Sequence, residues 1–222
     1  GQKIAVIGST GSGKSTLVKL MNRFYDVSRG SIEINGVDIR KYNLESLRTQ
    51  IGYVAQKAHM FKGSIQSNIC FGKPEASVEE MVHAATVAQA SDFISTREHG
   101  YEDEIAEDGT NISGGQKQRL SIARVILKKP SLYIYDDSFS ALDFKTDATL
   151  RKALKPEVKN AIFFVVAQRI STIMDSDMII VLDEGQIIGM GTHAQLLKDC
   201  SVYQEIAHSQ LTQKELDDYE RN

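Results

Sequence analysis

The sequence has no tryptophan, only two cysteines and three prolines, and no long apolar run. Cys70 and Cys200 form neither a C-x-x-C pair nor a zinc-binding pattern, which is typical of free thiols in a reducing compartment. No apolar run approaches the roughly 18 residues that a membrane-spanning helix needs, and no signal peptide is visible. The composition, 41% apolar and 25% charged, is that of an ordinary soluble globular protein.

An excess of charge of one sign is also missing. The formal net charge is -3 and the pI is about 6.0, so no electrostatic footprint favours nucleic acid as a partner. The length of 222 residues suits one large domain or two small ones. Because the chain opens at Gly1 and enters a strand almost at once, we expect a domain cut from a longer polypeptide. The histidines are scattered without metal-ligand spacing: His59, His83, His99, His193 and His208.

A phosphate-binding pattern lies near the N-terminus. An apolar run at 3–7 precedes it and predicts a buried strand, and residues 17–21 predict a helix because they contain neither Gly nor Pro. Strand, loop and helix are the context that a P-loop of the form G-x-x-x-x-G-K-[ST] requires. The predicted phosphate-binding residues are Gly8, Ser9, Thr10, Gly11, Ser12, Gly13, Lys14, Ser15 and Thr16.

The residue types in this loop suit a triphosphate. Its glycines let the backbone bend tightly and aim N–H groups inward, and the start of the helix adds the positive end of its dipole. Lys14 supplies a point charge for the β- and γ-phosphates, and the Ser15 hydroxyl can ligate Mg²⁺. We therefore expect a nucleoside triphosphate and Mg²⁺ as the cofactors, and the family resemblance described below implies that the triphosphate is ATP.

The hydrophobic pattern along the rest of the chain predicts an α/β fold. Asn35-Gly36 is a strong hairpin signal between short strands. Capping boxes are predicted at Ser77 and Ser113, and a hairpin turn at Glu184-Gly185. Near-continuous apolar runs at 132–135, 162–166 and 178–182 predict parallel strands buried on both faces. Further strands are predicted at 31–34, 37–39, 51–55 and 186–190, and helices at 44–48, 77–89, 91–96, around 147–154, at 170–174, from 192 and at 202–207.

These elements predict a P-loop NTPase with a RecA-like parallel-sheet core, an antiparallel β subdomain and an inserted α-helical subdomain. The core is expected at about 1–69 and 130–208, and the helical subdomain at about 70–129. Residues 101–111 are polar and acidic, which predicts a loop, and 209–222 are expected to form a frayed helix or a disordered tail. Asp136 follows the apolar run 132–135 as in the Walker B pattern, and at a strand end it can hold Mg²⁺ directly or through water.

Residues 111–119, Asn-Ile-Ser-Gly-Gly-Gln-Lys-Gln-Arg, resemble the signature motif of ABC ATPases. Gln56 is similar to the Q-loop of that family, and Ser140-Ala141-Leu142-Asp143 is similar to its D-loop. The order and spacing agree over about residues 1–208. In detail the chain most resembles the nucleotide-binding domain of an ABC exporter, because Glu104–Gly109 occupies the position of the exporter's acidic loop.

The resemblance implies an ATP hydrolase that works at the cytoplasmic face of the cell membrane with two partners, a transmembrane domain upstream and a second nucleotide-binding domain. In this family two such domains pack head to tail. Lys14, Ser15 and Asp136 would then hold the chain's own Mg-ATP, with Gln56 as a further metal ligand. The resemblance places Ser113, Gly114 and Gly115 on the nucleotide held by the partner, and it gives Gln116 and Asp143 as further nucleotide-binding residues.

Two positions that the family uses for catalysis differ from its usual residues. Asp137 stands where most members have Glu, and its carboxylate is withdrawn by about 1.5 Å, one C–C bond; a misplacement of about 1 Å can cost on the order of 10²-fold in rate. Gln168 stands where most members have His, and it cannot carry a positive charge. Both changes leave the binding groups in place and weaken the chemistry.

The signature motif, by contrast, is complete. Altered catalytic positions beside a complete signature fit heterodimeric bacterial multidrug exporters, in which one composite site is degenerate and the other hydrolyses ATP. The hypothesis is that this chain's P-loop builds the degenerate site, while its signature completes the active site of a different chain. The alternatives are a slow homodimeric ATPase and a purely regulatory nucleotide-binding module. An ABC ATPase of DNA repair or chromosome architecture is disfavoured, since no long coiled-coil insertion fits between Cys70 and Lys129.

One element of nucleotide recognition has no candidate in this sequence. ABC exporters usually stack the adenine on an aromatic residue upstream of the P-loop, and only seven residues precede Gly8. Tyr25 is instead interpreted as core or surface at the end of the P-loop helix. We therefore expect weaker nucleotide affinity for this chain than for a longer one.

Overall fold

The computed structural model describes residues 1–211, which form two compact units. The first unit contains residues 1–48 and 134–137 and, from residue 162 onward, the rest of the described chain. The second contains residues 49–133 and 138–161. Most of the predicted tail, 212–222, lies outside the described residues, whereas residues 209–210 belong to a helix.

The first unit is built on a sheet with β1 (Lys3–Gly8) at its centre. β1 runs parallel to β8 (Ile162–Val166) and to β9 (Met178–Asp183), and Ala5 is opposite Val165 and Ile179. β10 (Gln186–Gly191) returns antiparallel to β9, and the order is β10-β9-β1-β8-β7, with β7 at Leu132–Asp136. The three apolar runs predicted as strands are confirmed as β7, β8 and β9. Strands made of apolar residues are stable where both faces of the sheet are covered.

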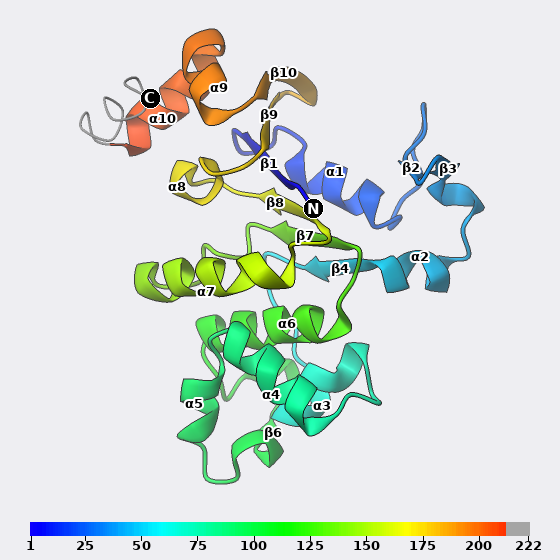
Figure 1. Ribbon diagram of the computed structural model, residues 1–222, viewed down its shortest axis with the longest axis vertical. Coiled ribbons are helices and arrows are strands. Elements are labelled where there is room, and N and C mark those ends of the chain that lie inside the picture. The colour runs from blue at the N-terminus through cyan, green and yellow to red at the C-terminus, as the bar shows by residue number, and fades with distance from the viewer. Residues whose placement is uncertain (212–222) are drawn as a thin grey trace. The chain divides into compact units, whose positions relative to one another are not determined.

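Short helices and one small hairpin complete the first unit (Figure 1). α1 (Lys14–Met21) follows β1, and β2 (Glu33–Ile34) pairs with β3 (Val37–Asp38) across Asn35 and Gly36, whose φ angles are 53° and 75°. The positive φ values are those that a tight hairpin turn requires. α2 spans Leu44–Gln50 and α8 spans Ile170–Ile173, and α9 (His193–Asp199) and α10 (Ser201–Gln210) pack on each other beyond β10.

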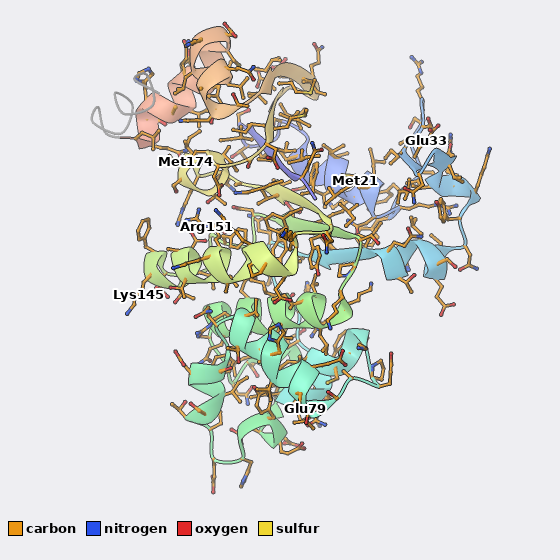
Figure 2. All side chains as sticks on the ribbon, viewed as in Figure 1. Met21, Glu33, Glu79, Lys145, Arg151 and Met174 are labelled. Carbon is orange, nitrogen blue, oxygen red and sulfur yellow. The ribbon has the colours of Figure 1, made fainter. Side chains whose placement is uncertain are left out.

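The second unit is mainly helical and is centred on α6 (Gly114–Lys128). α6 buries Leu120, Ile122, Ala123 and Ile126 and packs on α3 (Ile65–Ile69) and α4 (Val78–Val87). α5 (Ser91–Ser95) follows α4, and α7 (Phe144–Glu157) carries an ion pair between the half-buried Arg151 and the buried Asp147. Figure 2 shows Lys145 and Arg151 along α7 and Glu79 on α4. β4 (Ile51–Val54) pairs with β7, whose first two residues belong to this unit.

Two details of the predicted elements are wrong, and one helix, α3, was not predicted. α3 begins at Ile65, where Ser64 caps it by accepting a hydrogen bond from the Ser67 N–H. The predicted loop 101–111 contains β6 (Glu104–Ile105) and two 3₁₀ turns, since β6 pairs with the distant β5 (Gly63–Ser64). The predicted strand 31–34 is reduced to its last two residues.

The predicted capping boxes at Ser77 and Ser113 are both confirmed, and Thr192 forms a third at the start of α9. Each box satisfies two backbone groups that a helix start would otherwise leave without a partner. Within residues 1–211, none of the helices combines the length and apolar character that crossing a bilayer demands.

A buried histidine joins the last two helices and predicts a pH-dependent stability. His193 is 3% exposed, and its Nδ1 lies 2.7 Å from the hydroxyl of the buried Tyr203. Burial lowers the pKa of His193 below the ordinary value of 6.5, so the folded protein resists a proton that the unfolded chain accepts. The free energy of unfolding should therefore fall as the pH drops below about 6.5.

Denaturant unfolding between pH 5 and pH 8 measures this dependence. His193→Gln should remove part of the decline, whereas His208→Gln, at an exposed position on α10, should leave it unchanged. Equal pH profiles for both variants would contradict the assignment to His193.

Candidate functional site

The loop between β1 and α1 depends on glycine where the backbone turns. A Cβ at Gly8 would lie 2.0 Å from the carbonyl oxygen of Leu182 on the neighbouring strand, so no other residue fits there. Gly11 and Gly13 have φ angles of 86° and 102°, in the left-handed region that favours glycine. Gly13 is also the N-cap residue, immediately before the first residue of α1. The glycines thus let the chain leave the strand, turn sharply and start a helix within a few residues.

Lys14 is folded back over this loop. Its Nζ donates to the carbonyl oxygens of Gly8 and Ser9 at 2.8 and 2.6 Å and lies 3.3 Å from the Ser12 Oγ. Burial lowers the pKa of Lys14, and the nearby negative charges of Asp137 and Asp136 oppose that shift. The Lys14 ammonium group is therefore held in place by backbone carbonyl oxygens of the loop.

The loop is tied to the turn that follows β9. The Ser9 hydroxyl lies 3.3 Å from Oδ1 of Asp183, and the Gly185 N–H donates to the Ser12 carbonyl oxygen at 3.0 Å. A hollow of about 160 Å³ opens on the helix side of the loop and is lined by Gly11, Gly13, Lys14, Ser15 and Thr16. This hollow faces the first turn of α1, where helix N–H groups favour an anion.

Two carboxylates lie at the end of β7 in the same unit: Asp136 is its last residue and Asp137 follows it. Asp136 and Asp137 are only 5% and 8% exposed, and Asp137 has a φ of 48°, which Asp tolerates better than most residues. The Asp137 N–H donates to the Val166 carbonyl oxygen at 2.9 Å, which fixes it beside the end of β8. The Nε2 of Gln168, just beyond β8, donates to Oδ2 of Asp137 at 2.8 Å. The sequence predicted both residues but not this bond.

The donor groups of the first unit fit a metal-bound triphosphate. The Ser15 hydroxyl and the Asp136 carboxylate provide the oxygen ligands that Mg²⁺ prefers. Lys14 and the backbone N–H groups around Gly11 and Gly13 provide positive charge and hydrogen-bond donors beside the hollow. Of the predicted site residues, the structure therefore brings 8–16, Asp136, Asp137 and Gln168 together in one unit.

The remaining predicted residues belong to the second unit. Ser113 is exposed at the start of α6, and its Oγ accepts from the Gln116 N–H at 3.2 Å while the Gln116 Oε1 accepts from the Ser113 N–H at 2.9 Å. Gly114 is exposed, and no atom lies within 4 Å of the position a Cβ would take there. This end of α6 thus presents exposed backbone without large side chains.

Ala141 and Asp143 lie beside the start of α6. A Cβ on Gly115 would lie 3.4 Å from the Ala141 carbonyl oxygen. Asp143 caps α7 by accepting from the Thr146 N–H at 2.9 Å, and the hydrogen bonds from Thr146 lower the Asp143 pKa. Burial lowers the pKa of Arg119 on α6, and the charge of Asp143 opposes this shift. The two predicted motifs of this unit are therefore neighbours.

Sequence reasoning missed two residues that hold these motifs. The Gln118 Nε2 donates to the Ala55 carbonyl oxygen at 3.1 Å and so fixes the strand end that precedes the exposed Gln56. Asn111 accepts from the Ala106 N–H at 2.9 Å and donates to the Glu104 carbonyl oxygen at 2.8 Å, which braces the acidic segment 104–109. Both are polar residues within the motif 111–119, and their place in that motif was the only signal available.

The family model described as "ABC transporter" matches residues 1–140, more than half of the chain. The chain belongs to the ABC transporter family. It is 46% identical over 206 residues to a "putative multidrug export ATP-binding/permease protein" of Bacillus subtilis, covering 93% of this chain and 36% of that protein. It is 44% identical over 211 residues to the mitochondrial "iron-sulfur clusters transporter" of Homo sapiens, covering 95% of this chain and 28% of that protein.

A solved structure agrees with these relatives. The structure of a bacterial Atm1-family ABC exporter with ATP bound superposes with a TM-score of 0.91 at 38% identity, covering 94% of this chain and 37% of that one. The chain thus spans about a third of the length of the proteins it matches. The predicted α/β fold is confirmed as that of an ABC transporter nucleotide-binding domain, an ATPase domain whose cofactors are ATP and Mg²⁺.

Tyr25, interpreted from the sequence as core or surface, is 64% exposed just after α1. It therefore lies at the surface and not in the core of this ABC transporter domain.

Replacing Gly8 should damage the ABC transporter domain more than replacing a glycine in open space. Gly8→Ala places a methyl group against the Leu182 carbonyl oxygen and must force β1 and β9 apart, so we expect a loss of about 2 kcal/mol or more in unfolding free energy. Gly114→Ala is the matched control, because nothing lies within 4 Å of its Cβ. Denaturant unfolding of both variants measures the difference, and equal losses would show that the strand contact is relaxed at little cost.

Proposed function

We propose that the chain is the ATP-binding domain of a membrane exporter, working at the cytoplasmic face of the membrane with a transmembrane domain and a second, different nucleotide-binding domain. Its own P-loop binds Mg-ATP and cleaves it slowly or not at all, while its signature serves the active site of the partner. The hydrogen bond between Gln168 and Asp137 carries this proposal. The names of the relatives, which include a multidrug exporter and an iron–sulfur cluster transporter, support export.

Asp137 is poorly equipped to activate water. It has one methylene fewer than the glutamate that the family usually has, and its Oδ2 accepts a hydrogen bond from the Gln168 amide at 2.8 Å. That bond uses part of the acceptor capacity that a water molecule would need. Gln168 keeps its hydrogen-bonding ability but cannot become a cation beside a developing phosphate charge. Both residues thus favour a static pair over proton transfer.

The groups that bind nucleotide do not depend on this pair. The hollow is lined by the P-loop and the first turn of α1, and Lys14 takes its position from loop carbonyl oxygens. Ser15 and Asp136 remain as Mg²⁺ ligands. Binding without rapid cleavage follows, because affinity and chemistry depend on different side chains.

The exposed end of α6 supports a role for the signature toward a partner. Ser113 and Gly114 are exposed, and a helix start without side-chain obstruction is an anion site. The acidic segment 104–109 is held by Asn111, within the same motif, which suits a contact with the transmembrane domain.

The second candidate is a purely regulatory module in which ATP only joins two domains. The Asp137–Gln168 bond favours it for this chain's own site, and a slow homodimer is the third arrangement to test. Phosphate release distinguishes them: the regulatory module releases none in any assembly, the homodimer releases it alone, and the proposed heterodimer releases it only with its partner.

Restoring the usual family residues should raise turnover at this site. In the assembled transporter, Asp137→Glu together with Gln168→His should raise phosphate release from this chain's own site by about 10²-fold, because the carboxylate regains its reach and the imidazole can carry charge. Each substitution alone is the control and should give less. Unchanged turnover in the double variant would contradict the proposal.

The two serine caps separate a role in folding from a role in catalysis. Ser113→Ala and Ser77→Ala each remove one capping box and should each cost about 1 kcal/mol in stability. Only Ser113→Ala should lower turnover at the partner's site, measured by phosphate release from the heterodimer. A similar loss of turnover from Ser77→Ala would show that helix stability, and not contact with nucleotide, is responsible.

A further inference from the structure

The last residue of α10 is hydrogen-bonded to the segment that carries Gln168. The Gln210 Nε2 donates to the Gln168 carbonyl oxygen at 2.8 Å, and the Gln210 Oε1 accepts from the Ile170 N–H, also at 2.8 Å. One side-chain amide thus holds the backbone on both sides of Arg169. All four residues belong to the first unit.

These bonds satisfy backbone groups for which the local sequence provides nothing. Ile170 is the first residue of α8, and the first N–H groups of a helix have no partner inside it. Arg169 occupies the capping position and forms no side-chain cap. Gln210 therefore acts as the cap of α8, which ends beside Met174 in Figure 2, from a position 40 residues away in sequence.

The helix that carries Gln210 is itself firmly anchored. Tyr203 and Ala207 of α10 are fully buried, and the Tyr203 hydroxyl lies 2.7 Å from His193 on α9. An anchored helix restricts the positions that its terminal side chain can reach. The two hydrogen bonds of the Gln210 amide, the Gln210 clamp, therefore hold the loop at 168–170 in one place. The loop in turn fixes the Gln168 side chain, whose amide donates to Asp137.

We propose that Gln210 is a positioning residue that couples the C-terminal helix to the Asp137–Gln168 pair, a role that rests on the proposed function of that pair. The order of contacts is α10, Gln210, the Gln168 backbone, the Gln168 side chain and Asp137. Displacement of α10 releases the loop and loosens the hydrogen bond from Gln168 to the Asp137 carboxylate. The C-terminal helix is thereby a point at which events outside the nucleotide site change its chemistry.

The chemistry of the clamp provides a sharp test. Gln210→Met keeps the length of the side chain but has no amide, so the exchange rate of the Ile170 amide hydrogen, measured by NMR on this chain, should rise about five- to tenfold. Gln210→Glu keeps an acceptor for the Ile170 N–H, but when ionised it has no donor for the Gln168 carbonyl oxygen and its negative charge repels that oxygen, which loosens the loop. Protonation restores an O–H donor to the Gln168 carbonyl oxygen. The exchange rate in this variant relative to the unmodified chain at the same pH should therefore return toward one as the pH falls to about 4.3.

Gln204→Met is the matched control. The Gln204 Nε2 donates to the carbonyl oxygens of Leu197 and Lys198, at the end of α9, so this variant removes a similar amide from the same helix without touching the loop. Ile170 exchange should stay within twofold of the unmodified chain. Equal exchange in the Gln210→Met and Gln204→Met variants, or no recovery of the Gln210→Glu variant at low pH, would overturn the clamp.

A second measurement separates this proposal from the function on which it rests. With Asp137→Glu and Gln168→His in place, Gln210→Met should lower kcat for ATP severalfold while KM changes little, since the P-loop is untouched. An unchanged kcat in a working enzyme would overturn the coupling. If that background shows no turnover, the proposed function fails and the coupling fails with it, while Ile170 exchange still decides whether the clamp exists.

Discussion

The parallel pairing of β1 with β8 and β9 is the constraint on which the nucleotide site depends. In this register Gly8 lies opposite Leu182 and Val6 opposite Val166, so the chain leaves all three strands at one edge of the sheet. The P-loop, the segment with Gln168 and the turn after Asp183 therefore meet there, as ligand sites do at the carboxyl ends of parallel strands. A shift by one residue would move every inward side chain to the other face.

The sequence predicted those parts of the molecule whose cause is local. The P-loop depends on glycines and a lysine within residues 8–16, and each predicted capping box joins residues three apart. The parallel strands were visible because burial on both faces needs an uninterrupted apolar run. Each of these signals lies within one short stretch of sequence, so it can be recognised without knowing which other parts of the chain that stretch contacts.

Contacts between distant residues could not be predicted. Gln168 and Asp137 are separated by 31 residues, and Gln210 and Gln168 by 42, and a glutamine gives no sign of its partner. The pairing of β5 with β6 was missed for the same reason, since two-residue strands have no periodicity to detect. The sequence identified Asn111 only as part of the motif 111–119. Its hydrogen bonds to residues 104 and 106 could be recognised only in the structure.

The hydrogen bond between Asp137 and Gln168 makes the two residues depend on each other. The shorter carboxylate and the neutral amide are complementary, because the amide donates at 2.8 Å to an oxygen that cannot reach as far as that of glutamate. A mismatched pair would leave a carboxylate that is only 8% exposed without this donor, at a cost in stability. Each residue therefore stabilises the other in its present form, and a change to one alone would remove this hydrogen bond. Under the function proposed above, this pair leaves the fold and the phosphate-binding loop intact while it replaces the two residues that the family usually has at these positions.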